Sequence, residues 1–164
     1  MLNFNLGVMY EEGQGVARDT AEAARWYRQA AERGLPMAQM ALADLYANHR
    51  GPAQDLVEAL RWYRKAAERA CAPALHELAQ AYATGRGVPA DDVEAYLWMD
   101  LAAFRARGAL REQCSAERDA LARTMSPEQV AQAERRGVEW KRNGLRSQTV
   151  CVPLQTPPDA GAHA

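Results

Sequence analysis

The sequence predicts an all-α fold in which helical hairpins stack into a solenoid. Three observations favour this class: side chains recur every 36 residues, apolar residues follow helical spacing, and alanine is abundant while aromatic residues make up 7% of the chain. Alanine suits closely packed helices, whereas a β-sandwich needs more β-branched and aromatic residues. At 164 residues, the chain is long enough to bury a core.

The 36-residue repeat places large and small side chains at equal intervals. One tyrosine and one tryptophan occupy fixed positions of each repeat, and a pair of alanines follows each tryptophan. Small alanines let a neighbouring helix approach the indole ring closely. We therefore predict a structural core ladder of aromatic side chains that runs through the solenoid: Tyr10, Tyr46, Tyr82, Trp26, Trp62 and Trp98.

Each repeat reads as two helices joined by a glycine-containing loop. In the first repeat, a helix from Asn3 to Glu12 is followed by Gly13, which suits a left-handed helix end, and by Gly15, which lets the loop reverse. A phosphate-binding loop would follow a strand and end in G-K-[ST], and the sequence has neither. The glycines are therefore predicted to be turn residues.

An aspartate begins the second helix of each repeat, with a glutamate three residues later. This pattern resembles a capping box, in which the aspartate accepts from free backbone N–H groups and the glutamate reaches back. The predicted capping residues are Asp19, Asp55 and Asp91, together with Ser126, which pairs with Gln129 at the start of a later helix.

The periodicity divides the chain into five segments. We predict repeats at 2–37, 38–73 and 74–108, capping helices at 109–143, and a disordered tail at 144–164. The capping helices would cover the apolar end that the third repeat otherwise exposes.

Composition excludes several classes of protein. With 20 basic and 21 acidic residues the net charge is −1, which argues against nucleic-acid binding. The first residues show neither a signal peptide nor a membrane span, so we expect no membrane insertion and a cytoplasmic location, or a periplasmic one if a signal segment lies upstream. Cys71, Cys114 and Cys151 lack a short pairing, which favours buried or idle thiols over a disulfide framework or a zinc site. We predict no metal and no cofactor.

The string L-G-x-x-Y-x-x-G-x-G-V-x-x-D…A-x-x-W-Y-x-x-A-A-x-x-G, from Leu6 to Gly34, resembles the Sel1-like repeat. This family is related to the tetratricopeptide repeat and has a longer loop between its helices. The resemblance covers about residues 2–108. The middle copy departs from the pattern in its loop, and it has Ala70 where the first copy has Gly34. The resemblance implies a right-handed α-solenoid that acts as an adaptor or scaffold for other proteins.

The sequence offers little for catalysis. One cysteine-rich branch of the family has been linked to binding or hydrolysing β-lactams, but its cysteines recur in every repeat and these do not. Cys71 with His76 is a conceivable thiol–imidazole pair that lacks a third, orienting group, and His49 and His163 have no neighbouring metal ligands. We predict no catalytic residue. A weak β-lactam-binding or amide-hydrolysing protein and a purely structural repeat module of a larger assembly remain alternatives.

A partner is expected on the concave surface formed by the first helix of each repeat. Leu6 and Tyr10 should face the core, while the opposite positions differ between repeats, as a specific binding surface would. The predicted partner-binding residues are Asn5, Val8, Glu12, Asp44, Asn48, Glu77, Gln80 and Thr84. The stripe is polar and mildly acidic. It can be simply a solvated face, and if it binds a partner, a peptide with basic or hydrogen-bonding side chains fits it. We expect a monomer or weak oligomer that binds a protein or peptide.

Overall fold

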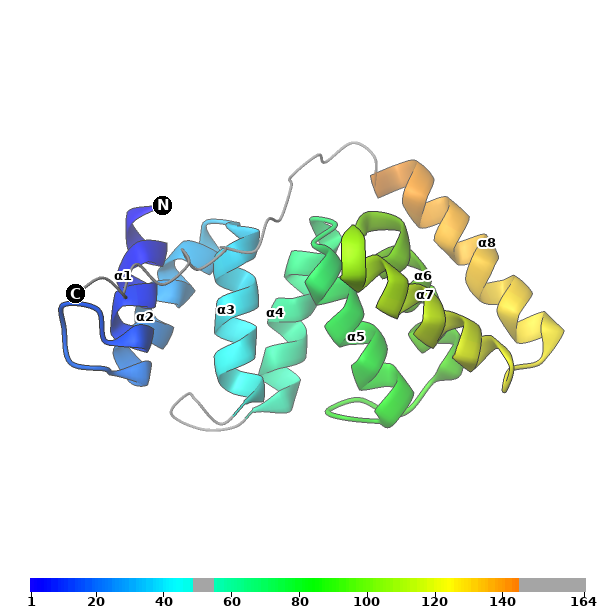
Figure 1. The fold of residues 1–164 in the computed structure, drawn as a ribbon, viewed down its shortest axis with the longest axis horizontal. Helices are drawn as coiled ribbons and strands as arrows, with labels where there is room; N and C mark the ends of the chain where they lie inside the picture. Colours follow the sequence, from blue (N-terminus) through cyan, green and yellow to red (C-terminus); the bar gives the residue numbers. More distant parts are fainter. Residues whose placement is uncertain (49–54, 145–164) are drawn as a thin grey trace, which may run out of the picture.

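The computed structural model describes residues 1–48 and 55–144, and in this part of the chain every regular element is an α-helix. The helices pair into hairpins that follow one another along a single axis (Figure 1). They are α1 (Leu2–Glu12), α2 (Thr20–Glu32), α3 (Pro36–Ala47), α4 (Leu56–Glu68), α5 (Ala72–Thr84), α6 (Asp92–Arg105), α7 (Gly108–Ala122) and α8 (Pro127–Gly144). The fold is the predicted solenoid of three repeats closed by two further helices. The predicted tail, apart from Gly144, lies outside the described residues.

The helix ends follow the local chemistry of the loops. Gly13 and Gly85 adopt left-handed conformations with φ of 75° and 70°, and their N–H groups bond carbonyls of the last helical turn. Asp19 accepts hydrogen bonds from the backbone N–H groups of Ala21 and Glu22, at 2.9 and 3.0 Å. The corresponding aspartates of the next two repeats each accept from the amide three residues onward.

The glutamates of these boxes do not reach back, which corrects that part of the sequence interpretation. Instead, the backbone N–H of each capping aspartate donates to the backbone carbonyl of the tyrosine that recurs in each repeat. In the first repeat this is Asp19 N–H to Tyr10 O, at 2.9 Å. Glu58 and Glu94 each accept a hydrogen bond from the indole N–H of the tryptophan one turn later. The distances are 3.0 Å from Trp62 and 2.9 Å from Trp98. The reciprocal pairing does occur before α8, where Ser126 and Gln129 cap each other.

The buried core differs from the predicted ladder. Trp62 and Trp98 are buried, with 4% and 8% of their surface exposed, but Trp26 is only partly buried and its indole nitrogen has no partner. The aromatic rings that fill the first two hairpins most completely are Tyr27 and Tyr63, at 1% and 3% exposed. Each directly follows a predicted tryptophan, because the inner face of the second helix is wide enough to hold two adjacent positions.

Two of the predicted tyrosines, Tyr46 and Tyr82, lie at the junctions between repeats instead. Tyr10, Tyr46 and Tyr82 are all partly buried. The guanidinium of Arg28 donates to the Tyr46 hydroxyl, and Arg64 donates to the Tyr82 hydroxyl at 2.6 Å. The second helix of one repeat is thereby tied to the first helix of the next.

Helix α1 packs tightly against Tyr27 of α2 at Gly7. A Cβ atom at this position would lie 2.4 Å from two ring carbons of Tyr27. Gly7→Ala is therefore expected to lower the free energy of unfolding by about 1–3 kcal/mol, although alanine favours helices. Gly137→Ala in α8 is the matched control, because its Cβ would meet ordinary contacts of 3.6 Å and should be neutral or stabilising. Chemical denaturation of both variants measures the difference, and a stabilised Gly7→Ala would contradict this packing.

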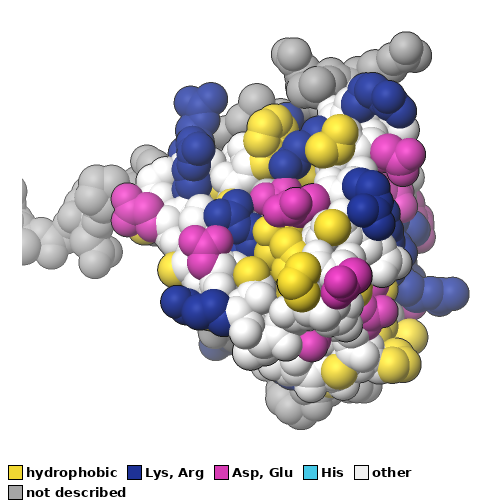
Figure 2. Space-filling model, turned by 90° about the vertical axis from the view of Figure 1, so that its right-hand side faces the viewer, with side chains coloured by type: hydrophobic (Ala, Val, Ile, Leu, Met, Phe, Trp, Pro, Cys, Tyr) yellow, Lys and Arg dark blue, Asp and Glu magenta, His cyan; other side chains and the backbone are white. Residues whose placement is uncertain are grey.

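Helices α7 and α8 cover α6 at the end of the solenoid. The carboxylate of Asp100 on α6 accepts from Arg118 of α7 at 3.1 Å and from Lys141 of α8 at 2.6 Å. Glu94, also on α6, pairs with Arg136 of α8. Figure 2 shows this end of the molecule, where charged side chains surround small groups of hydrophobic ones. These ion pairs link α6 to both closing helices, beside apolar residues of α7 and α8 that pack against the core.

Candidate partner-binding groove

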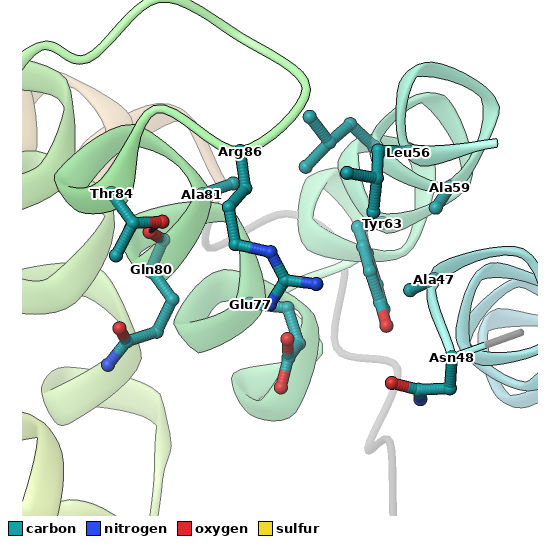
Figure 3. Close-up of a pocket in the computed structure, with 11 residues that line it drawn as sticks. Ala47, Asn48, Leu56, Ala59, Tyr63, Glu77, Gln80, Ala81, Thr84 and Arg86 are labelled. Atoms are coloured by element: carbon teal, nitrogen blue, oxygen red, sulfur yellow. Dashed lines mark hydrogen bonds between the residues drawn. The ribbon is translucent and has the colours of Figure 1, made fainter. Parts of the chain in front are cut away.

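A pocket of about 100 Å³ lies between α3, α4 and α5 (Figure 3). Its apolar wall comes mostly from α4 and from the facing alanines of α3 and α5. Its polar rim comes from the last turn of α3, the exposed face of α5 and the loop after α5. The lining residues are Ala47, Asn48, Leu56, Ala59, Leu60, Tyr63, Glu77, Gln80, Ala81, Thr84 and Arg86.

The pocket gathers half of the residues predicted to bind a partner. Asn48 from α3 and three residues of α5 lie on its rim: Glu77, Gln80 and Thr84. The first helices of the second and third repeats, α3 and α5, therefore contribute to the same pocket, as the repeat register predicted. The three predicted residues of α1 do not line this pocket: Asn5, Val8 and Glu12.

Asp44 does not line the pocket, but it accepts a hydrogen bond from a residue that does. The hydroxyl of the buried Tyr63 donates to Asp44 Oδ1 at 2.5 Å. Burial, and then the neighbouring Asp44 carboxylate, raise the pKa of Tyr63 far above its usual range, so the phenol remains a neutral donor. Asp44 thus holds Tyr63 in position beside the pocket, a role that differs from the predicted direct contact with a partner.

Arg86 is the rim residue that sequence reasoning missed. It follows α5 in a loop that the repeat pattern assigned to chain reversal alone. In the structure its side chain extends across the pocket toward Glu77 (Figure 3). The sequence shows a basic residue two positions after the helix end, in "GRG". This pattern alone does not predict where the side chain points. The rim therefore has both signs of charge.

A polar cluster continues the groove from α5 onto α7. Glu117 accepts hydrogen bonds from His76 at 3.0 Å, Gln80 at 2.5 Å and Gln113 at 2.9 Å. Burial opposes ionisation of Glu117, but the hydrogen bonds from Gln113, His76 and Gln80 outweigh it and lower the pKa of this carboxyl below its usual value. The cluster fixes the orientation of Gln80 at the pocket rim.

The lowered pKa of Glu117 predicts how stability depends on pH. A carboxyl that is more acidic in the folded chain contributes stability above its unfolded pKa, and this contribution disappears as the pH falls through the folded pKa. Glu117→Gln is therefore expected to destabilise the protein at pH 7, with a difference from wild type that shrinks in acid. Denaturation at several pH values measures this. Glu112→Gln, an exposed position of the same helix, should leave stability unchanged, and a Glu117→Gln effect that grows in acid would contradict the assignment.

Neither cysteine in the described part of the chain offers an accessible thiolate. Cys114 is buried, and burial followed by the charge of Glu117 raises its thiol pKa to about 11, which keeps it protonated at neutral pH. Cys71 is disulfide-bonded, which corrects the expectation of an idle thiol there, and the imidazole of His76 is bonded to Glu117 and Gln80. Within residues 1–48 and 55–144, no three His, Cys, Asp or Glu side chains are grouped to hold a metal ion. His49 and His163 lie outside the described residues.

Comparison with known proteins places the chain in a family. The model of the Sel1 repeat matches residues 2–35, 36–71 and 72–103, which together make up more than half of the sequence. The chain belongs to the Sel1 repeat family. The matched segments each contain one hairpin, α1–α2, α3–α4 and α5–α6, with α7 and α8 beyond them. None of the curated proteins that were compared matches this Sel1 repeat protein.

Two solved structures resemble this Sel1 repeat protein. A Sel1 repeat protein from Oxalobacter formigenes has 35% sequence identity and a TM-score of 0.62, over 70% of this chain and 86% of that chain. A protective antigen of uropathogenic Escherichia coli strains, described as having an SLR fold, has 22% identity and a TM-score of 0.67, over 96% of this chain and 42% of that one. The second likeness extends through α7 and α8 and concerns the fold alone. Among the described residues, no helix is long and apolar enough to cross a bilayer.

Proposed function

We propose that this Sel1 repeat protein is a non-catalytic adaptor that binds a peptide segment of another protein in the groove between α3 and α5. The observation that carries the proposal is the pocket at the junction of two repeats, because it combines an apolar wall with a polar rim. In many peptide complexes, an apolar pocket holds one anchor side chain of the peptide, and polar groups around the pocket form hydrogen bonds with it.

The pocket is suited to one apolar side chain of moderate size. Its volume of about 100 Å³ exceeds several times the roughly 15 Å³ that a single water requires, and Leu56, Leu60 and the facing alanines provide the wall. Asn48 and the amide of Gln80 lie at the rim, where they can bond the backbone of an extended peptide. Burial of an aliphatic side chain would supply roughly 1.5–3 kcal/mol.

The charges at the rim narrow the partner's chemistry. Glu77 and Arg86 carry opposite charges at the same opening, so a strongly basic peptide gains from one and loses to the other. We therefore favour an apolar anchor flanked by polar or mixed-charge residues over a peptide whose flanking residues are mainly basic.

Peptide selection with matched variants tests this proposal. Peptides are first selected from a random library on the full chain, and their affinity is then measured by calorimetry. Thr84→Trp places an indole at the pocket rim and is expected to weaken binding at least tenfold. Glu12→Trp is the matched control, because residue 12 occupies the same repeat position on α1, where it is exposed and away from the pocket.

The two variants separate the groove from the rest of the surface. Both substitutions are at exposed positions, and unchanged thermal unfolding verifies that each variant is folded. Selected peptides that bind Thr84→Trp as well as wild type would remove the pocket from the proposed function. Equal losses in both variants would show a general surface effect and would also contradict it.

A further inference from the structure

Helix α6 ends with an aromatic side chain at a position that the core does not use. Phe104, in the last turn of α6, is 50% exposed. The equivalent positions of the first two repeats hold exposed glutamates, Glu32 and Glu68. Because this position faces solvent in all three repeats, packing within the array does not account for a large apolar ring there. The ring is accessible to a partner.

Basic residues gather at the end of α6 that carries this ring. Arg105 is the last residue of α6, Arg107 directly precedes α7, and Arg111 lies in the first turn of α7. From α8, the ammonium of Lys141 lies 5.0 Å from the centroid of the Phe104 ring. We call these five residues the α6–α7 cluster. Figure 1 shows the start of α7 and the end of α8 toward the same upper edge of the array, and Figure 2 shows basic side chains beside hydrophobic ones in the upper part of this end.

The arginines of the cluster keep their charge unneutralised by the described part of the chain. Among residues 1–48 and 55–144, none of the three makes an ion pair or a side-chain hydrogen bond. Between positions 101 and 111 the sequence has no acidic residue. Asp100, one turn before Phe104, is already paired with Arg118 and Lys141, at 3.1 and 2.6 Å. The cluster therefore presents a positive charge that carboxylates of a partner can neutralise.

We propose that the α6–α7 cluster binds an acidic segment of a partner protein. An apolar side chain of that segment packs on Phe104, and flanking carboxylates pair with the arginines. Arginine and aromatic side chains are enriched at the centres of protein interfaces. A guanidinium can bind a carboxylate through two parallel hydrogen bonds, which adds directional specificity to the charge attraction.

An acidic peptide suits the surface better than a nucleic acid does. The chain as a whole carries a net charge of −1, and exposed carboxylates such as Glu112 and Glu139 lie on the same two helices, α7 and α8. A long polyphosphate would meet these acids, whereas a short acidic segment need contact only the cluster. No residue of the cluster lines the pocket between α3, α4 and α5, so this second surface is independent of the proposed groove.

Selection of acidic peptides tests the proposal. The library fixes one central phenylalanine between positions that are mainly Asp and Glu, and the selected peptides are titrated into isotope-labelled full chain and followed by NMR. Backbone signals at the end of α6, the start of α7 and the end of α8 are expected to shift. Phe104→Glu, which introduces the residue type of the equivalent positions, should weaken binding roughly tenfold. Val138→Glu, 62% exposed on α8, should leave it unchanged.

Matched variants separate the cluster from general charge effects. Arg107→Glu is expected to weaken binding roughly tenfold, whereas Arg123→Glu, exposed at the other end of α7, should have little effect. Serine in place of the peptide's phenylalanine should weaken binding to wild type but hardly to Phe104→Glu, because both changes remove the same contact. Thr84→Trp at the other groove should leave the affinity unchanged. Thermal unfolding verifies that each variant is folded.

Several results would overturn the proposal. These are no binding by any selected peptide, shifts confined to the groove between α3 and α5, or equal losses in Arg107→Glu and Arg123→Glu. Equal affinity for a single-stranded oligonucleotide of the same charge would also overturn it, because the surface would then recognise charge alone. So would nuclear Overhauser contacts in the free chain between Phe104 and residues 145–164, or a dimer in sedimentation analysis that Phe104→Glu dissociates, because the chain itself would then occupy the surface.

Discussion

Trp62→Ala is expected to lower the free energy of unfolding by about 3–5 kcal/mol, one of the two largest effects foreseen for a single substitution in this protein. The indole is 4% exposed, its N–H donates to Glu58 at 3.0 Å, and the ammonium of Lys65 lies 3.9 Å from the ring centroid. Truncation to alanine removes all these contacts and leaves a cavity in the middle hairpin. Chemical denaturation of the full chain measures the change.

Trp26→Ala is the matched control for this prediction. Trp26 holds the same repeat position, but it is only partly buried and its indole nitrogen is unbonded. The Trp26 side chain buries less apolar surface on folding than Trp62 does, and its truncation breaks no hydrogen bond. The loss of unfolding free energy should therefore be smaller than that of Trp62→Ala by at least about 1 kcal/mol. Equal effects would show that repeat position outweighs burial and would contradict this view of the core.

Asp100→Ala is expected to loosen the closing pair of helices and to destabilise the protein by about 2 kcal/mol. Asp100 pairs with Arg118 of α7 and Lys141 of α8, and all three side chains are less than a third exposed, at 19%, 27% and 26%. Its loss leaves two cations without this partner in a partly desolvated site. The expected loss is smaller than that for a fully buried ion pair, because water still reaches these groups and screens their charges.

Asp119→Ala provides the control for the closing helices. Asp119 pairs with the same Arg118 but is 62% exposed, so its removal should cost less than about 0.5 kcal/mol. Hydrogen exchange of the two variants adds a spatial readout. Faster exchange in α7 and α8 is expected for Asp100→Ala alone, and uniform exchange across the array would contradict the assigned role.

The arrangement of the fold could be predicted from the sequence because the repeat makes each local pattern appear three times. Glycine, aspartate and alanine at fixed positions determine where helices end, begin and approach one another. The 36-residue period placed Asn48 and Thr84 on the same side of successive helices, and both line the pocket. Periodicity thus located four of the eleven residues that line the pocket.

The burial of individual side chains and the remaining residues at the groove depend on contacts between helices and loops, which the repeat period does not predict. The repeat pattern identified Trp26 with Trp62, but Trp62 is buried and Trp26 is only partly buried. Asp44 was predicted on the open surface, yet the Tyr63 hydroxyl engages it. Arg86 is in a loop, where the direction of a side chain follows from the turn geometry and not from helical spacing.

The most direct test of the proposed groove is NMR mapping of a library-selected peptide on the isotope-labelled full chain. The account predicts shifts of backbone amides at the end of α3 and along the rim of α5, centred on Asn48, Glu77 and Thr84, with little change in α8. Shifts confined to the outer surfaces of α2 and α4, or to α1, would contradict it.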